Sequence, residues 1–66
     1  MKVTVNGEAH HVDESTTVFE LLESLALDPD AMVVEHNGLV LERERYDDTL
    51  LGKGDVLEVL RFVGGG

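Results

Sequence analysis

The first residues of the chain alternate between apolar and polar side chains around a single Asn-Gly step. Val3 and Val5 are separated by Thr4, the chain reaches Asn6-Gly7, and a second strand-like stretch continues to Val12. Asn-Gly suits a tight hairpin because both central residues of the turn need positive φ. This pattern predicts a β-hairpin over residues 2–12.

The apolar spacing changes in the next segment. Leucine and valine recur there with the i, i+3, i+4, i+7 spacing of an amphipathic helix, at Val18, Leu21, Leu22 and Leu25. Thr17 and Glu20 have the spacing of a capping box, in which each side chain binds the backbone N–H of the other residue. Pro29 cannot continue a helix, so we expect a helix that begins after Thr17 and is closed by Pro29.

Strand patterns return after Pro29. Residues 31–42 contain a third strand, a second Asn-Gly step at residues 37–38 and a short fourth strand over residues 39–41. Residues 43–55 form a polar connector, in which we expect one helical turn with Tyr46 and either Leu50 or Leu51 packed beneath it. Gly52 and Gly54 predict a tight turn into a last strand that reaches Phe62.

Five short strands and one main helix favour a two-layer α+β architecture, because the helix stripe and one face of the sheet must cover each other. The strand after the helix cannot form a simple hairpin with the one before it. We therefore expect a mixed sheet with the first and last strands parallel at its centre. The residues expected to face the helix are Val3, Val5, Met32, Val34, Leu57 and Val59. Those expected to face away are Lys2, Thr4, Val33, Glu35, Val56, Glu58, Leu60 and Phe62.

The face turned away from the helix contains apolar side chains where a solvated sheet face would be polar. Val33, Leu60 and Phe62 lie there beside Glu35 and Glu58. An apolar patch rimmed by charge on a small domain often marks a protein contact, so these five residues are a candidate partner-binding patch. The alternative is that they are scattered exposed apolar residues of the kind found on every surface. A one-residue shift of register would exchange the two faces.

Composition narrows the choice of partner and of chemistry. The 66 residues include no cysteine, and they have a formal net charge of −9. Disulfides, thiolate zinc sites and cysteine nucleophiles are therefore excluded. The negative charge repels nucleic acid and anionic lipid and favours basic protein surfaces. No apolar run approaches the length of a membrane span, so we expect a cytoplasmic domain that binds proteins and neither nucleic acid nor membrane.

Two further groups of residues are candidate sites. The histidines are His10, His11 and His36. Adjacent residues of a strand point to opposite faces, so His10 and His11 cannot share a metal ion, and we predict no metal site. The connector contains four carboxylates, Glu42, Glu44, Asp47 and Asp48. Acid-base catalysis needs a pocket that separates two pKa values, so we interpret these residues as a solvated cluster that pairs locally with Arg43 and Arg45.

The chain ends on Gly64, Gly65 and Gly66. Glycine adds no side chain to a core and loses more backbone freedom on ordering than other residues. The α-carboxyl of Gly66 is ionised at neutral pH, and a chain without Cβ atoms can thread a narrow channel in a second protein. We expect a folded domain over residues 1–63 and a flexible reactive tail over residues 64–66. The alternative is a frayed end without a role.

The chain resembles the ubiquitin-like sulfur carriers of the β-grasp fold, and among them the ThiS-like carriers of thiamine biosynthesis. The matching stretches are "VTVNGE", "VFELLESL", "VVEHNGLVLERERY" and "GKGDVLEVLRFVGGG". They follow one another in order over nearly the whole length, and the terminal Gly-Gly after a strand is the most specific of them. Leu41 departs from the pattern, because many such carriers have proline there.

The resemblance implies a function for the tail. An E1-like activating enzyme would use ATP and Mg²⁺, both bound by that partner, to adenylate the Gly66 carboxylate, with Gly64 and Gly65 threaded into the enzyme. A cysteine desulfurase or other persulfide donor would then supply sulfur, and the resulting thiocarboxylate would serve a thiazole synthase. The chain itself would bind no cofactor and would not be an enzyme. Three alternatives stay open: a molybdopterin-type carrier, a ubiquitin-like protein modifier, and a non-covalent binding module with an idle tail.

Overall fold

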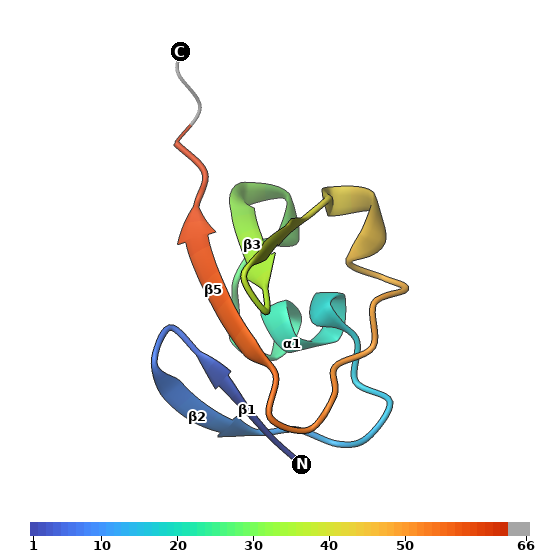
Figure 1. Cartoon of the computed structure of the whole chain (residues 1–66). Helices are drawn as coiled ribbons and strands as arrows, with labels where there is room; N and C mark the ends of the chain where they lie inside the picture. The colour runs from blue at the N-terminus through green and yellow to red at the C-terminus, as the bar shows by residue number, and fades with distance from the viewer. Residues whose placement is uncertain (64–66) are drawn as a thin grey trace.

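The structure, a computed structural model, describes residues 1–63. Five strands and one α-helix follow the order expected from the sequence, with two short 3-10 helices between them (Figure 1). The strands are β1 (Lys2–Val5), β2 (Glu8–His11), β3 (Met32–His36), β4 (Leu39–Leu41) and β5 (Val56–Arg61). The helices are α1 (Val18–Ser24), η1 (Pro29–Ala31) and η2 (Arg43–Arg45).

All five strands form one mixed sheet with the order β2-β1-β5-β3-β4. β1 and β5 are parallel, whereas the β1–β2, β3–β5 and β3–β4 pairs are antiparallel. α1 lies against one face of this sheet (Figure 1). The expected α+β architecture with a five-stranded mixed sheet, one main helix and parallel first and last strands is therefore confirmed. It is the arrangement of the expected β-grasp fold.

Both Asn-Gly steps form the predicted turns, and both attach the turn to the central strand. Asn6 and Asn37 have φ of 49° and 52°, in the left-handed region that this turn requires. The side-chain amide of Asn6 donates to the carbonyl oxygen of Val59 at 3.0 Å and accepts from its N–H at 2.8 Å. The side-chain oxygen of Asn37 accepts from the N–H of Val56 at 2.9 Å. We call these two contacts the amide clamps; they hold β5 from both sides.

The core lies between α1 and the inner face of the sheet, as the alternation predicts. All six residues expected to face the helix are buried, together with Val18, Leu21, Leu22, Tyr46 and Leu51. Of the two leucines considered beneath the connector, Leu51 is buried and Leu50 is exposed. The Tyr46 hydroxyl donates to the backbone oxygen of Met32 at 2.8 Å, and burial raises its pKa. The connector is therefore anchored to β3 by one buried hydrogen bond.

The helix begins where it was expected to begin, but it ends earlier than expected. Both hydrogen bonds of the capping box between Thr17 and Glu20 are present. α1 ends at Ser24, however, and Pro29 begins η1 instead of closing the helix. The chain leaves the helix through Ala26, whose φ is 60°, with backbone bonds from Ala26 to Glu23 and from Leu27 to Leu22. This is a Schellman end with alanine at the position that usually holds glycine. None of the helices in residues 1–63 is long and apolar enough to cross a membrane.

Candidate functional site

β5 is the element that leads toward the C-terminus, and it is held along its whole length. It lies between β1 and β3 in the centre of the sheet. The N–H of Phe62, one residue beyond the strand, still donates to the backbone oxygen of Ala31 at 2.6 Å. The predicted reactive tail, Gly64, Gly65 and Gly66, lies outside the described residues, so its role stays a prediction. In the described part of the chain, the last anchored residue is therefore Phe62, two residues before the first of these glycines.

The five residues of the candidate partner-binding patch lie together on the face of the sheet opposite α1. Val33 of β3 pairs directly with Leu60 of β5, and Glu35 pairs directly with Glu58. Leu60 is 58% exposed and Phe62 is 61% exposed, while Val33 and Glu35 are half-buried. The predicted placement of these residues on one face is therefore confirmed, and their role in partner binding stays a prediction. We call the set Val33, Glu35, Glu58, Leu60 and Phe62 the outer-face patch.

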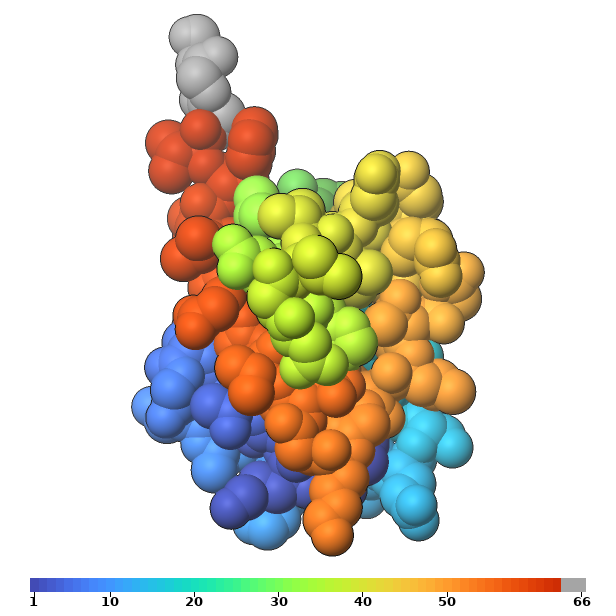
Figure 2. All heavy atoms as spheres, in the orientation of Figure 1, coloured from blue at the N-terminus to red at the C-terminus, as the bar shows by residue number. Residues whose placement is uncertain are grey.

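Neighbouring strands extend the apolar surface beyond the residues singled out from the sequence. Val40 of β4 pairs with Glu35 and is 68% exposed. Val56 precedes Glu58 by two residues on the same face of β5 and is also exposed. Figure 2 shows β5, in orange to red, and the β3–β4 segment, in yellow-green, side by side on the surface turned to the viewer. Val40 was missed because its strand is only three residues long, too short for its alternation to assign a face.

A second cluster lies at the opposite end of β5, around Asp55. The carboxylate accepts from the imidazole Nε2 of His36 at 2.7 Å and from the backbone N–H of Gly52 at 2.7 Å. It also accepts from the side-chain amide of Asn37 at 3.1 Å. Burial by itself raises the pKa of Asp55, but these hydrogen bonds outweigh the burial, so the pKa lies below its ordinary value. Sequence analysis missed this cluster because its members come from two segments that are far apart in the sequence, residues 36–37 and 52–55.

We expect the stability of the domain to fall in acid through Asp55. Because the pKa of Asp55 is lower in the folded than in the unfolded chain, its contribution is complete above the unfolded value of about 3.9 and is lost as the pH falls through the folded value. Asp55→Asn keeps the shape but removes the charge, and it should cost about 1–3 kcal/mol at neutral pH. Urea titrations between pH 7 and pH 2 should show a shallower acid loss for the variant. An equally steep loss would contradict this assignment.

The expected local ion pairs of the connector are present for Arg45 but not for Arg43. Arg45 pairs locally with Asp48 at 3.1 Å. Arg43 does not pair within the cluster; its Nε donates to Asp30 of η1 at 2.8 Å, and its guanidinium lies 5.2 Å from the centre of the Tyr46 ring. The prediction of local pairing is therefore wrong for Arg43, because the fold brings η1 and an aromatic surface to it. Arginine stacks on aromatic faces while its donors bind a carboxylate.

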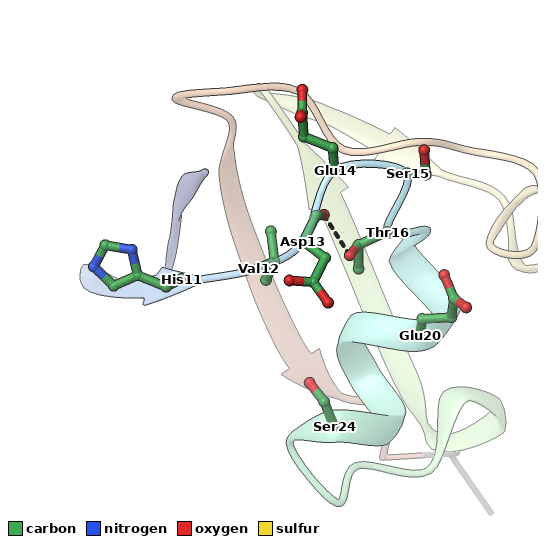
Figure 3. Close-up of a pocket in the computed structure, with 8 residues that line it drawn as sticks. All are labelled: His11, Val12, Asp13, Glu14, Ser15, Thr16, Glu20 and Ser24. Atoms are coloured by element: carbon green, nitrogen blue, oxygen red, sulfur yellow. Dashed lines mark hydrogen bonds between the residues drawn. The ribbon is translucent and has the colours of Figure 1, made fainter.

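The remaining polar residues make local hydrogen bonds at the start of α1. An open groove between the end of β2 and the start of α1 is lined by His11, Asp13, Glu14, Glu20 and neighbouring residues. Figure 3 shows His11 set apart from the carboxylates of Asp13 and Glu20. Glu20 is engaged by Thr17 in the capping box, and Thr16 donates to the backbone oxygen of Asp13 at 2.6 Å. No group of three metal-ligating side chains occurs within residues 1–63.

Comparison with known proteins gives a consistent result over the whole chain. The model of the ThiS family matches residues 3–66. A crystal structure of the thiamine biosynthesis protein ThiS from Geobacter metallireducens has 48% sequence identity and a TM-score of 0.85, with all of both chains covered. The sulfur carrier protein ThiS of Bacillus subtilis is 38% identical over 53 residues, which are 80% of each chain.

Longer proteins contain a similar segment. A thiazole synthase of Magnetococcus marinus is 39% identical over all 66 residues of this chain, and a second thiazole synthase, from Paramagnetospirillum magneticum, is 36% identical over the same length. The chain spans about a fifth of the length of these two relatives, 20% in each case. A segment of this kind therefore occurs within proteins that are named for thiazole synthesis.

Proposed function

The chain belongs to the ThiS family, and from this premise we propose that it is a sulfur carrier of thiamine biosynthesis whose reactive group is the carboxylate of Gly66. The observation that carries the proposal is that the family match runs to Gly66, which follows the central strand β5 and its last anchored residue, Phe62, by four residues. The Bacillus subtilis relative is named as a sulfur carrier. A carrier of this design presents its reactive atom on the main chain, so it needs no catalytic side chain of its own.

The chemistry requires activation because a carboxylate oxygen is a poor leaving group. In the first step a Gly66 oxygen attacks the α-phosphorus of ATP and pyrophosphate leaves, which gives an acyl adenylate. The terminal sulfur of a persulfide then attacks the acyl carbon and AMP leaves. The product is an acyl disulfide, which contains a new C–S bond and keeps the S–S bond of the persulfide. A thiol then attacks the donor's sulfur and breaks that S–S bond, which leaves the thiocarboxylate and a disulfide between the thiol and the donor. Splitting one difficult substitution into two easier ones is the general benefit of covalent activation. An E1-like enzyme binds the ATP and Mg²⁺, and a cysteine desulfurase or other persulfide donor supplies the sulfur.

The acceptor in this proposal is a thiazole synthase. Support comes from the two longer relatives, which bear that name and contain a segment similar to the whole of this chain. A carrier and an acceptor that work on the same sulfur atom benefit from being close together, because linkage raises their effective concentration. The outer-face patch is the surface by which the folded domain is held while Gly66 reaches a partner's active site.

Intact mass measures the proposed chemistry directly. Incubation with the E1-like enzyme of the source organism, ATP and a persulfide donor should raise the mass by about 16 Da, because one sulfur replaces one oxygen at the activated acyl carbon. Omission of ATP is the control and should leave the mass unchanged. An unchanged mass in the complete reaction would count against the carrier function. Covalent ladders on denaturing gels would instead identify a protein modifier.

A further inference from the structure

The base of the glycine tail depends on one hydrogen bond. The N–H of Phe62 donates to the backbone oxygen of Ala31 at 2.6 Å, and this is the last backbone hydrogen bond along residues 1–63. The side chains beyond β5 add little to it, because Phe62 is 61% exposed and Val63 is 84% exposed. The position of Ala31 therefore sets the direction in which the chain leaves the sheet.

Ala31 belongs to η1, the short green helix beside the end of β5 (Figure 1). None of the three residues of η1 is fully buried, although Ala31 packs against the core with part of its surface. The N–H groups of Asp30 and Ala31 both donate to Asp28, at 2.9 Å each. These two bonds shape η1 but do not join it to the rest of the fold, so its position depends on contacts with other elements.

Arg43 of η2 supplies such a contact. Its Nε donates to the carboxylate of Asp30 at 2.8 Å, which is the one ion pair that η1 forms among residues 1–63. The guanidinium carbon lies 5.2 Å from the centre of the Tyr46 ring and 5.5 Å from that of Phe19. Phe19 belongs to α1, and the Tyr46 hydroxyl binds Met32, the residue directly after η1. Because arginine can stack on aromatic rings while it donates to a carboxylate, this side chain joins η1 to α1 and to the connector.

We propose that Arg43 is a positioning residue for the adenylation of Gly66: through Asp30 it holds η1, and η1 in turn holds the base of the tail. The proposal rests on the proposed function, since it concerns that adenylation. A residue whose backbone is already fixed need not be ordered when the enzyme takes up the tail. Fixing the backbone of one residue changes an equilibrium constant by a factor of about 5–30. In this role Arg43 contacts neither ATP nor the reacting carboxylate.

Arg43→Gln and Asp30→Asn test the proposal from the two ends of the ion pair. In the free protein, each should speed hydrogen exchange at the Phe62 amide about fivefold and leave exchange at the Leu57 amide unchanged. Each should also lower kcat for adenylation about fivefold, because fewer docked molecules have the tail in place. The KM for the carrier should change less than about twofold, since docking is untouched. The two variants change the net charge in opposite directions, so a shared effect cannot come from overall charge.

Arg45→Gln is the matched control. Arg45 lies in the same short helix and pairs with Asp48 at 3.1 Å, so the substitution removes the same charge and the same kind of ion pair without reaching η1. It should alter neither exchange at Phe62 nor kcat. The double variant Arg43→Gln/Asp30→Asn should be no slower than Arg43→Gln alone, because the two residues act through one contact. Asp30 is exposed, so Asp30→Asn carries the test should Arg43→Gln fold poorly.

Several results would overturn the proposal. Unchanged exchange at Phe62 in both variants would show that the ion pair does not hold the base of the tail. A low kcat for Arg43→Gln beside a normal one for Asp30→Asn would show that Arg43 contacts the enzyme directly, and an equal fall for Arg45→Gln would reduce the effect to charge. A melting temperature of Asp30→Asn lowered by more than about 5 °C would assign the pair to the stability of the whole domain, since an exposed ion pair contributes little by itself.

The failure of this role and the failure of the proposed function give different results. A wild-type protein that is never adenylated would reject the proposed function, and this role with it. A wild-type protein that is adenylated at the same rate as both variants would reject this role alone.

Discussion

Removal of Gly65 and Gly66 is expected to abolish sulfur loading completely and to leave the melting temperature unchanged. The shortened chain still ends in a glycine carboxylate, but that carboxylate lies about 7 Å short of its original reach, because each extended residue spans about 3.3–3.6 Å. Adenylation needs the attacking oxygen within about 3–3.5 Å of phosphorus. The glycines have no side chain to bury, so the core should be unaffected.

Intact mass under loading conditions and thermal denaturation together measure this result. An additional alanine after Gly66 is the complementary control: it keeps all three glycines and moves the carboxylate one residue further out, and it should also prevent loading. A shortened protein that still accepts sulfur would show that the chemistry is not at Gly66. A melting temperature lowered by several degrees would show that the last two glycines contribute to the fold.

Leu57→Ala should remove a large part of the stability of the folded domain. Leu57 is fully buried in the central strand, and such truncations cost about 2–5 kcal/mol because they remove buried area and leave a cavity. A domain of 66 residues has a total stability of only about 3–10 kcal/mol. Circular dichroism should show a melting temperature lower by at least about 10 °C.

Leu60→Ala is the matched control for that variant. It is the same substitution in the same strand, three residues further on, but on the exposed face. Its free energy of unfolding should stay within about 0.5 kcal/mol of the wild type. Its adenylation should be impaired, because Leu60 belongs to the outer-face patch. Equal losses of stability in the two variants would contradict the assignment of the two faces of β5.

The sheet, its register and its two faces could be predicted because local rules determine them. The alternation of Val3 and Val5 and the two Asn-Gly steps specify strand direction and turn type without knowledge of the rest of the chain. The end of α1 could not be predicted in this way. Ala26 adopts the left-handed conformation although alanine rarely does so, because the bonds from Ala26 and Leu27 back to the helix satisfy its last carbonyl groups.

The candidate site likewise has features that the sequence predicts and features that it does not. The membership of the outer-face patch follows from alternation, but the direct opposition of Glu35 and Glu58 depends on how β3 and β5 are aligned in space. The Asp55 cluster and the Arg43–Asp30 pair join residues far apart in sequence, and no local pattern marks them. What the sequence cannot supply here is therefore the pairing of side chains across elements.

The amide clamps have a consequence for the chemical lifetime of the protein. Asn-Gly bonds are prone to deamidation, since the glycine N–H attacks the side-chain amide with no Cβ in its way. Deamidation of Asn6 would replace its N–H donor by an anionic oxygen that faces the carbonyl oxygen of Val59. Deamidation of Asn37 would create a second carboxylate next to that of Asp55. In the folded protein both amides are held by β5 or by the turn before it, which restrains their approach to the glycine N–H. Deamidation at Asn6 and Asn37 should therefore occur mainly in the molecules that are unfolded at a given time.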